Sequence, residues 1–183
     1  DGVKYGTLPD KGLGWGKGEL RHYMKLYADT VYEYCLKEKP AVIHGASNFV
    51  NGIIAGEVGN RLGIPSIYEV RGLWEVTRAS RKPHFRYMPD YLLYRDMEVL
   101  ACNSVTKAFA ITGALAKELE LSGVKKPFEL LPNAVDPSRF QPQEKDLKLA
   151  EEIKIPKDKV VIGYVGSIVK YEGLNILLKS IKF

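Results

Sequence analysis

The chain has 183 residues, of which 45% are hydrophobic and 27% are charged, and its formal net charge is +5. This composition is typical of a globular protein and excludes a disordered or fibrous one. No apolar run comes near the roughly 20 residues that a membrane-spanning helix needs, and nothing at the start of the chain is typical of a signal peptide. The length suits one domain, or one domain and a piece of another.

The cysteines and histidines do not indicate a metal site. Cys35 and Cys102 lie far apart and lack the spacing of metal ligands. We interpret them as reduced structural thiols in a cytosolic protein, the alternative being a disulfide. The three histidines are scattered without a zinc signature, so no bound metal is expected.

The first part of the chain predicts two helices and two strands. Residues 1–18 contain six glycines and no clear period, which favours loop with a short strand at residues 3–5. Beyond them, apolar residues three and four positions apart predict helices, and short apolar runs predict strands. In chain order the predicted elements are helix 20–39, strand 41–44, helix 50–62 and strand 66–70.

The second part repeats this alternation after a polar loop predicted from residue 71 to about residue 89. The predicted elements that follow are helix 90–103, strand 108–111, helix 113–121, strand 128–131, a polar helix between residues 140 and 160, and strand 160–165. Strand–helix–strand repetition with short connections indicates a parallel sheet with helices on both faces. We therefore expect an α/β protein with a Rossmann-like sheet.

In open parallel sheets, ligands bind at the carboxyl ends of the strands, and three stretches of this chain lie at such ends. The first holds His44, Gly45, Ser47 and Asn48. The serine and asparagine can simply cap the next helix, and the histidine can be a packing residue. The alternative is a polar pocket for sugar hydroxyls or phosphate at the helix N-terminus.

The second stretch holds Arg71, Gly72, Trp74 and Glu75, after the strand at residues 66–70. An arginine at a strand end can bind phosphate through two parallel hydrogen bonds, and a tryptophan offers a surface on which a sugar can stack. The alternative is an Arg–Glu pair that caps the loop.

The third stretch contains Gly166 and Gly173, after the last predicted strand. Gly166 lets the backbone approach a ligand closely, and Gly173 opens a helix whose N-terminal amides can hold a diphosphate. Two glycines seven positions apart are a weak signal by themselves.

A basic patch with interleaved tyrosines lies between residues 71 and 95. One interpretation is a solvated face, and the other is a surface for an anionic substrate or for the cytoplasmic leaflet of a membrane. No nucleic-acid partner is expected, because no binding motif accompanies the charge.

Two patterns carry a family resemblance through their order and spacing. The first is Leu-Pro-Asn-Ala-Val-Asp followed by Arg-Phe, and the second is Ile-Gly-Tyr-Val-Gly-Ser followed by Glu-Gly-Leu. They resemble the interdomain linker and the first donor-domain turn of family-four glycosyltransferases, which are retaining enzymes with the GT-B fold. The resemblance covers about residues 38–183.

This resemblance implies a domain organisation. Residues 1–133 would be a partial N-terminal acceptor-side domain, and residues 134–183 the hinge with the first strand and helix of a second Rossmann-like domain, which binds the nucleotide-sugar. The chain would then be a fragment that begins after the glycine-rich loop of the first domain and ends before a Glu-x₇-Glu pair of the second.

The resemblance also implies roles for individual residues. The run Arg-Gly-Leu-Trp-Glu at residues 71–75 is similar to that of an exopolysaccharide-type branch of the family. In this branch Arg71 and Gly72 would lie near the transferred sugar, and Trp74 and Glu75 would contact the acceptor.

The donor diphosphate would bind at the turn from Gly166 to Gly173. Most relatives have arginine and lysine where this chain has Ser167 and Glu172. Lys170 would restore one positive charge, or Glu172 would contact the sugar or a ribose hydroxyl. These five residues form the candidate donor site.

The function implied by the resemblance is transfer of a sugar, with retention, from a nucleoside-diphosphate-sugar to a glycan or lipid-linked acceptor. No cofactor is expected, and no catalytic base or nucleophile is assigned. The enzyme would be cytoplasmic or placed at the inner face of the membrane, and this chain alone would be inactive. Two alternatives remain open: a sugar-nucleotide epimerase or phosphorylase of the same fold, and a non-catalytic binding domain.

Overall fold

The computed structural model describes residues 2–7, 20–156 and 159–181. The chain divides into two compact units, Asp1–Asn133 and Ala134–Phe183. The first unit contains a four-stranded parallel sheet and the longer helices, and the second contains short helices joined by extended segments.

Helices and strands alternate along the first unit. The helices are α1 (Leu20–Glu38), α2 (Phe49–Leu62), α3 (Trp74–Arg81), the 3₁₀ helix η1 (Pro83–Tyr87), α4 (Pro89–Ser104) and α5 (Gly113–Ser122). The strands are β1 (Ile43–Ala46), β2 (Ser66–Val70), β3 (Lys107–Ala110) and β4 (Phe128–Leu130). The predicted α/β class with a Rossmann-like parallel sheet is confirmed.

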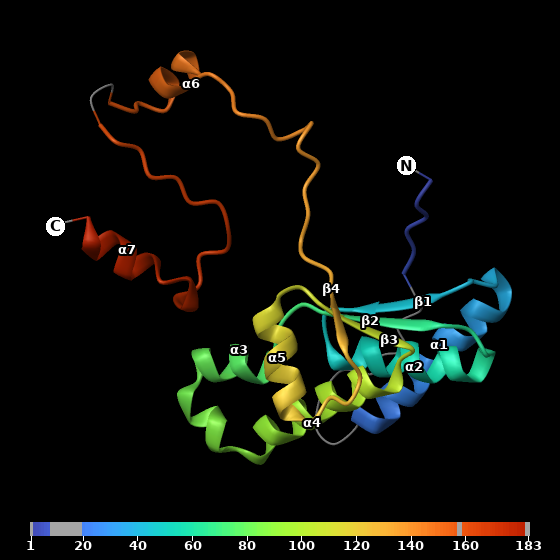
Figure 1. Ribbon diagram of the computed structural model, residues 1–183. Helices are drawn as coiled ribbons and strands as arrows, with labels where there is room; N and C mark the ends of the chain where they lie inside the picture. Colours follow the sequence, from blue (N-terminus) through green and yellow to red (C-terminus); the bar gives the residue numbers. More distant parts are fainter. Residues whose placement is uncertain (1, 8–19, 157–158, 182–183) are drawn as a thin grey trace. The chain divides into compact units, whose positions relative to one another are not determined.

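The strands lie in the order β1-β2-β3-β4 and are all parallel. Crossover connections between parallel strands are right-handed. Because every connection moves one strand further in the same direction, the connecting helices fall on one face of the sheet, as Figure 1 shows for α2 and α4. The prediction of helices on both faces is therefore wrong for the residues that the structure describes.

The helix-covered face of the sheet forms the core. Tyr68 and Val70 of β2 and Ala108 and Ala110 of β3 alternate onto this face and are fully buried. Helix α2 packs closely against them, since a Cβ atom at Gly52 would lie 2.7 Å from the Tyr68 ring. Residues of the opposite face, which alternate with these, are mostly half-buried or exposed.

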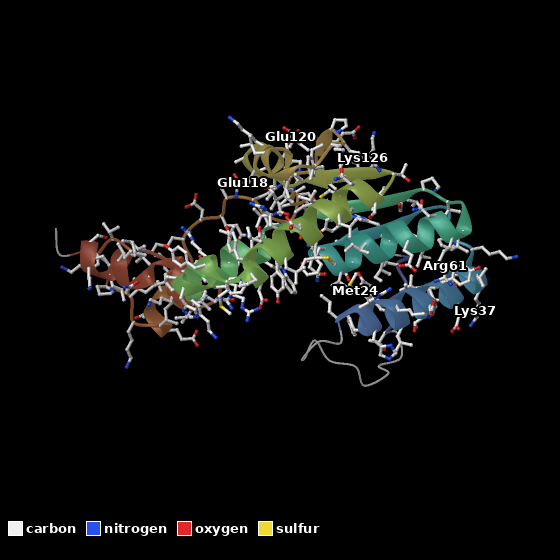
Figure 2. The ribbon with its side chains drawn as sticks, turned by 90° about the horizontal axis from the view of Figure 1, so that it is seen from below. Met24, Lys37, Arg61, Glu118, Glu120 and Lys126 are labelled. Carbon is white, nitrogen blue, oxygen red and sulfur yellow. The ribbon has the colours of Figure 1, made fainter. Side chains whose placement is uncertain are left out.

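Helix α1 packs on α2 rather than on the sheet. Arg61 near the end of α2 donates to Asp29 of α1 at 2.9 Å, and its guanidinium lies 3.9 Å from the centre of the Tyr32 ring. Figure 2 shows Arg61 between these two helices. Cys35 of α1 and Cys102 of α4 are buried and free, as predicted for structural thiols.

Three local predictions in the first unit differ from the structure. Residues 2–7 form no strand. The strand predicted at residues 41–44 lies at Ile43–Ala46, because Gly45 continues the strand instead of turning the chain. Residues 74–87, predicted as a polar loop, form α3 and η1. The inner face of α3 carries the buried Glu75 and Ala79, so a charge interrupts the apolar spacing that would have revealed the helix.

The second unit holds α6 (Leu147–Glu152), η2 (Lys170–Glu172) and α7 (Leu174–Ser180). None of its described residues is buried, and Val160 and Val165 are more than nine-tenths exposed. The strand predicted at residues 160–165 is not formed, because a strand needs a hydrogen-bonded neighbour and the described part of this unit offers none.

Candidate functional site

Strands β1 and β2 bring His44, Glu69 and Arg71 together: His44 is the second residue of β1, and Glu69 and Arg71 lie at the carboxyl end of β2. One carboxylate oxygen of Glu69 accepts a hydrogen bond from Nε of Arg71 at 2.8 Å. The other carboxylate oxygen lies 3.3 Å from Nε2 of His44. Of the three side chains, Glu69 is buried and the other two are about half exposed, at 45% for His44 and 56% for Arg71.

The parallel register explains this cluster. His44 is paired with Ile67, and Ala46 with Glu69. Because side chains alternate along a strand, His44, Glu69 and Arg71 all point to the face of the sheet opposite the connecting helices. The cluster therefore lies on the less covered face, with Glu69 and Arg71 at the carboxyl end of β2 and His44 in the first half of β1.

The Arg71 guanidinium has hydrogen-bond donors beyond the one that contacts Glu69. A guanidinium has five N–H donors, and within the described residues the contact of Arg71 with Glu69 uses only Nε. The Nη groups remain for an anion, and the imidazole of His44 adds a donor or acceptor beside them. The Arg–Glu pair considered from the sequence exists, and it orients Arg71 without occupying the two-pronged end that binds phosphate.

The other residues of the first stretch have structural duties. Asn48 is the N-cap of α2, where its Oδ1 accepts from the backbone N–H of Asn51 at 3.2 Å. Ser47 adopts a positive φ of 86°, and its N–H donates to the carbonyl of Glu69 at 3.1 Å. Gly45 allows close packing, since a Cβ there would lie 2.4 Å from the carbonyl oxygen of Asn51. These contacts fix the turn that carries His44.

Of the residues predicted in the second stretch, Trp74 is partly exposed and Glu75 is buried. Trp74 begins α3 and is 38% exposed, with its ring 6.3 Å from that of Phe49. Glu75 beside it is only 3% exposed and faces the core. Gly72 has open space around its Cα and no unusual φ. Trp74, three residues after Arg71 in the chain, therefore presents part of its ring at the surface, whereas Glu75 does not.

A buried acidic cluster lies beneath this stretch. The hydroxyl of Tyr68 donates to the Glu98 carboxyl, which is 1% exposed. Burial raises the pKa of Glu98 to about 8, with the nearby Glu75 adding to the rise, so Glu98 is largely protonated at neutral pH. Burial also raises the pKa of Glu75. The sequence prediction included neither Glu98 nor Glu69 among the site residues; for Glu69 the signal was an acid within the otherwise apolar run of β2.

The third stretch lies in the second unit. Gly166 is closed in by the Tyr164 hydroxyl, which donates to the carbonyl of Ser167 at 2.9 Å. Lys170 and Glu172 are the two ends of η2, and Gly173, with φ 71°, precedes α7. This stretch therefore has a 3₁₀ turn and a short helix, without the strand predicted before them.

The described residues include no cluster of three or more histidine, cysteine, aspartate or glutamate side chains that would hold a metal ion. Among the described helices, none combines the length and the apolar character that crossing a membrane requires.

Comparisons with known proteins give a consistent result. The model of the family described as Glycosyltransferase Family 4 matches residues 8–139. The chain is 32% identical over 156 residues to the capsular polysaccharide biosynthesis glycosyltransferase CapM of Staphylococcus aureus. That alignment covers 80% of this chain and 38% of CapM, so the chain spans well under half of this curated relative.

Among solved structures, the chain is similar to the UDP co-structure of S. aureus MnaA. The identity is 15%, the TM-score is 0.42, and the match covers 63% of this chain and 29% of that chain.

Proposed function

Because the chain belongs to glycosyltransferase family 4, we propose that it is part of an enzyme that transfers a sugar from a nucleoside-diphosphate-sugar to a glycan or lipid-linked acceptor, with retention. The observation that carries this proposal is the cluster of Glu69 and Arg71, at the carboxyl end of β2, with His44 of the neighbouring β1. The resemblance to a capsular polysaccharide enzyme supports a sugar polymer as the product class.

The cluster suits the charge that develops in sugar transfer. Cleavage of the donor leaves a nucleoside diphosphate, whose negative charge needs fixed hydrogen-bond donors and positive charge. Arg71 is held by Glu69 at 2.8 Å, so its Nη groups are available for the leaving diphosphate or for the transferred sugar. His44, on the same carboxylate, is placed to contact a sugar hydroxyl.

The first unit would bind the acceptor, with Trp74, three residues after Arg71 in the chain, as a stacking surface. The second unit would contribute the donor turn, with Gly166, Ser167, Lys170, Glu172 and Gly173 beside the diphosphate. Helix N-termini and positive side chains would stabilise the leaving group, so neither a cofactor nor a bound metal is part of the proposal. We place the enzyme in the cytoplasm or at the inner face of the membrane, and we expect residues 1–183 alone not to transfer sugar.

One assay separates this proposal from its alternatives. The full-length protein that carries this chain is incubated with nucleoside-diphosphate-sugars, with and without a glycan acceptor, and the products are followed by NMR. Acceptor-dependent release of the nucleoside diphosphate, with the anomeric configuration kept in the product, is the expected result. Conversion of the sugar-nucleotide to its epimer without acceptor would indicate an epimerase. Cleavage of a glycan that depends on phosphate would indicate a phosphorylase, and the absence of any turnover would indicate a binding domain.

A further inference from the structure

A hollow in the surface lies apart from the cluster of His44, Glu69 and Arg71. It has a volume of about 610 Å³ and lies between α3, with the residue after it, and the first half of α4. Its lining residues are Trp74, Thr77, Arg78, Arg81, Lys82 and Tyr94. The sequence prediction treated this region as loop, so the hollow was not foreseen.

The lining of the hollow is positive. It contains three cationic side chains and no carboxylate. In the described part of the chain, no acidic side chain lies within salt-bridge distance of Arg78 or Lys82, although such pairs occur elsewhere in the first unit, as between Arg71 and Glu69. The positive charges of Arg78 and Lys82, unpaired within the described residues, favour an anionic ligand on this concave surface.

Arg78 is already fixed in place. Its Nη1 donates to the Tyr94 hydroxyl at 3.0 Å, and its guanidinium lies 4.5 Å from the centre of the buried Phe85 ring. A side chain that is ordered before the ligand arrives loses less entropy on binding. Because the Tyr94 oxygen accepts from Arg78, its own O–H remains to donate to a ligand.

We propose that this hollow binds a phosphate or diphosphate group of the acceptor, an assignment that rests on the proposed function. Two cations without an acidic partner among the described residues, Arg78 and Lys82, match the charge of a phosphate or diphosphate better than that of a single carboxylate. Planar guanidinium groups bind phosphate through paired hydrogen bonds, and lysine adds a point charge. Trp74 lines the hollow and lies three residues after Arg71, so an acceptor anchored here by its phosphate would extend toward the candidate site.

Binding is measured on the 183-residue chain by tryptophan fluorescence. Trp15→Phe removes the other tryptophan, so that the emission reports Trp74 alone. Inorganic pyrophosphate is the first probe. Loss of one charge-assisted hydrogen bond weakens binding by about tenfold or more, so we expect this loss of affinity for Arg78→Gln and for Lys82→Gln, with an unchanged thermal unfolding midpoint.

Arg86→Gln is the matched control. Arg86 is exposed, carries the same charge and lies on η1, next to α3, but it does not line the hollow. We expect its substitution to change pyrophosphate affinity less than twofold. Equal weakening by all three variants would show diffuse attraction and would overturn the proposal, as would the absence of pyrophosphate binding.

Further probes identify the source of the phosphate. Tighter binding of farnesyl diphosphate than of pyrophosphate, with no binding of farnesol, supports a lipid-linked diphosphate, and equal binding supports a phosphate on a water-soluble glycan. Tighter binding of UDP than of either probe would make the hollow a donor site and overturn the acceptor assignment. Binding only to mixed vesicles of phosphatidylcholine and the anionic lipid phosphatidylglycerol, lost equally in Arg86→Gln, would overturn it in favour of a membrane surface.

The two proposals fail in different ways. Pyrophosphate binding at the hollow without sugar transfer by the full-length protein would contradict the proposed function. Sugar transfer that is unaffected by Arg78→Gln and Lys82→Gln, with no pyrophosphate binding, would contradict the hollow alone.

Discussion

Substitution of Glu69 should lower the activity strongly while it changes the free energy of unfolding little. Its carboxylate orients both Arg71 and His44, at 2.8 Å and 3.3 Å. Glu69→Gln keeps the size of the side chain and removes its charge. We expect the variant to fold normally and to lose at least tenfold in kcat/KM in the full-length protein.

The magnitudes follow from the exposure of the three side chains. Arg71 and His44 are about half exposed, so each pair with Glu69 contributes only about 0.2–1 kcal/mol to stability. The substitution also removes a charge that is only 8% exposed, which offsets part of this loss. The free energy of unfolding should therefore change by no more than about 1 kcal/mol. In the reaction, a displaced Arg71 loses a charge-assisted hydrogen bond of roughly 1.5–3 kcal/mol, which is tenfold or more in rate.

The assay compares kcat/KM and thermal unfolding for Glu69→Gln, Arg71→Ala and the double variant. If Glu69 acts through Arg71, the double variant is no slower than Arg71→Ala alone. Glu129→Gln is the matched control, because Glu129 lies on the same face of the sheet and pairs with Lys107 away from the site. Additive losses would refute the positioning of Arg71 by Glu69, and an equal loss in Glu129→Gln would refute any specific role of Glu69.

Three further predictions concern stability. The folded-state pKa of Glu98 lies near 8, above the ordinary 4.5, so its proton stabilises the fold below pH 4.5, and this contribution of about 5 kcal/mol is lost as the pH rises to 8. Chemical denaturation should show this decline in the wild type and a flatter profile in Glu98→Gln, whereas parallel profiles would contradict it. Gly45→Ala should destabilise by about 1–3 kcal/mol, because the new Cβ would lie 2.4 Å from a backbone oxygen, while Gly113→Ala, which has open space, should not; equal effects on the urea midpoint would count against close packing. Asn48→Ala removes the N-cap of α2 and should cost about 1 kcal/mol, and an unchanged midpoint would show that the cap contributes nothing.

The sequence predicted the fold well where local signals agreed with tertiary packing. The helix ending at Gly63 has both an apolar stripe and a left-handed glycine, and the strand at residues 66–70 is an apolar run with the predicted bounds. The prediction failed where a tertiary contact decided the structure. A glycine such as Gly45 is typical of a turn, but this one lies within β1, where the backbone of α2 packs so closely that a Cβ would not fit. The side of the sheet on which helices lie depends on strand order, which periodicity does not reveal.

The candidate site was predictable in part. Arg71 follows from the rule that ligands bind at the carboxyl ends of parallel strands. His44 was predicted by the same rule, but it is the second residue of β1, and it joins Arg71 because both contact the Glu69 carboxylate. Glu69 was visible as an acid in an apolar strand, but its role depends on the register that sets β1 beside β2. The hollow between α3 and α4 was not predictable, because the buried Glu75 interrupts the apolar spacing by which α3 could have been recognised.

The most direct test of the account is sugar transfer by the full-length protein with Arg71→Ala. We expect acceptor-dependent transfer by the wild type and at least a tenfold lower kcat/KM in the variant, with a thermal unfolding midpoint lowered by no more than about 4 °C. An unchanged kcat/KM in a folded variant would show that the cluster of His44, Glu69 and Arg71 is not where the sugar is transferred.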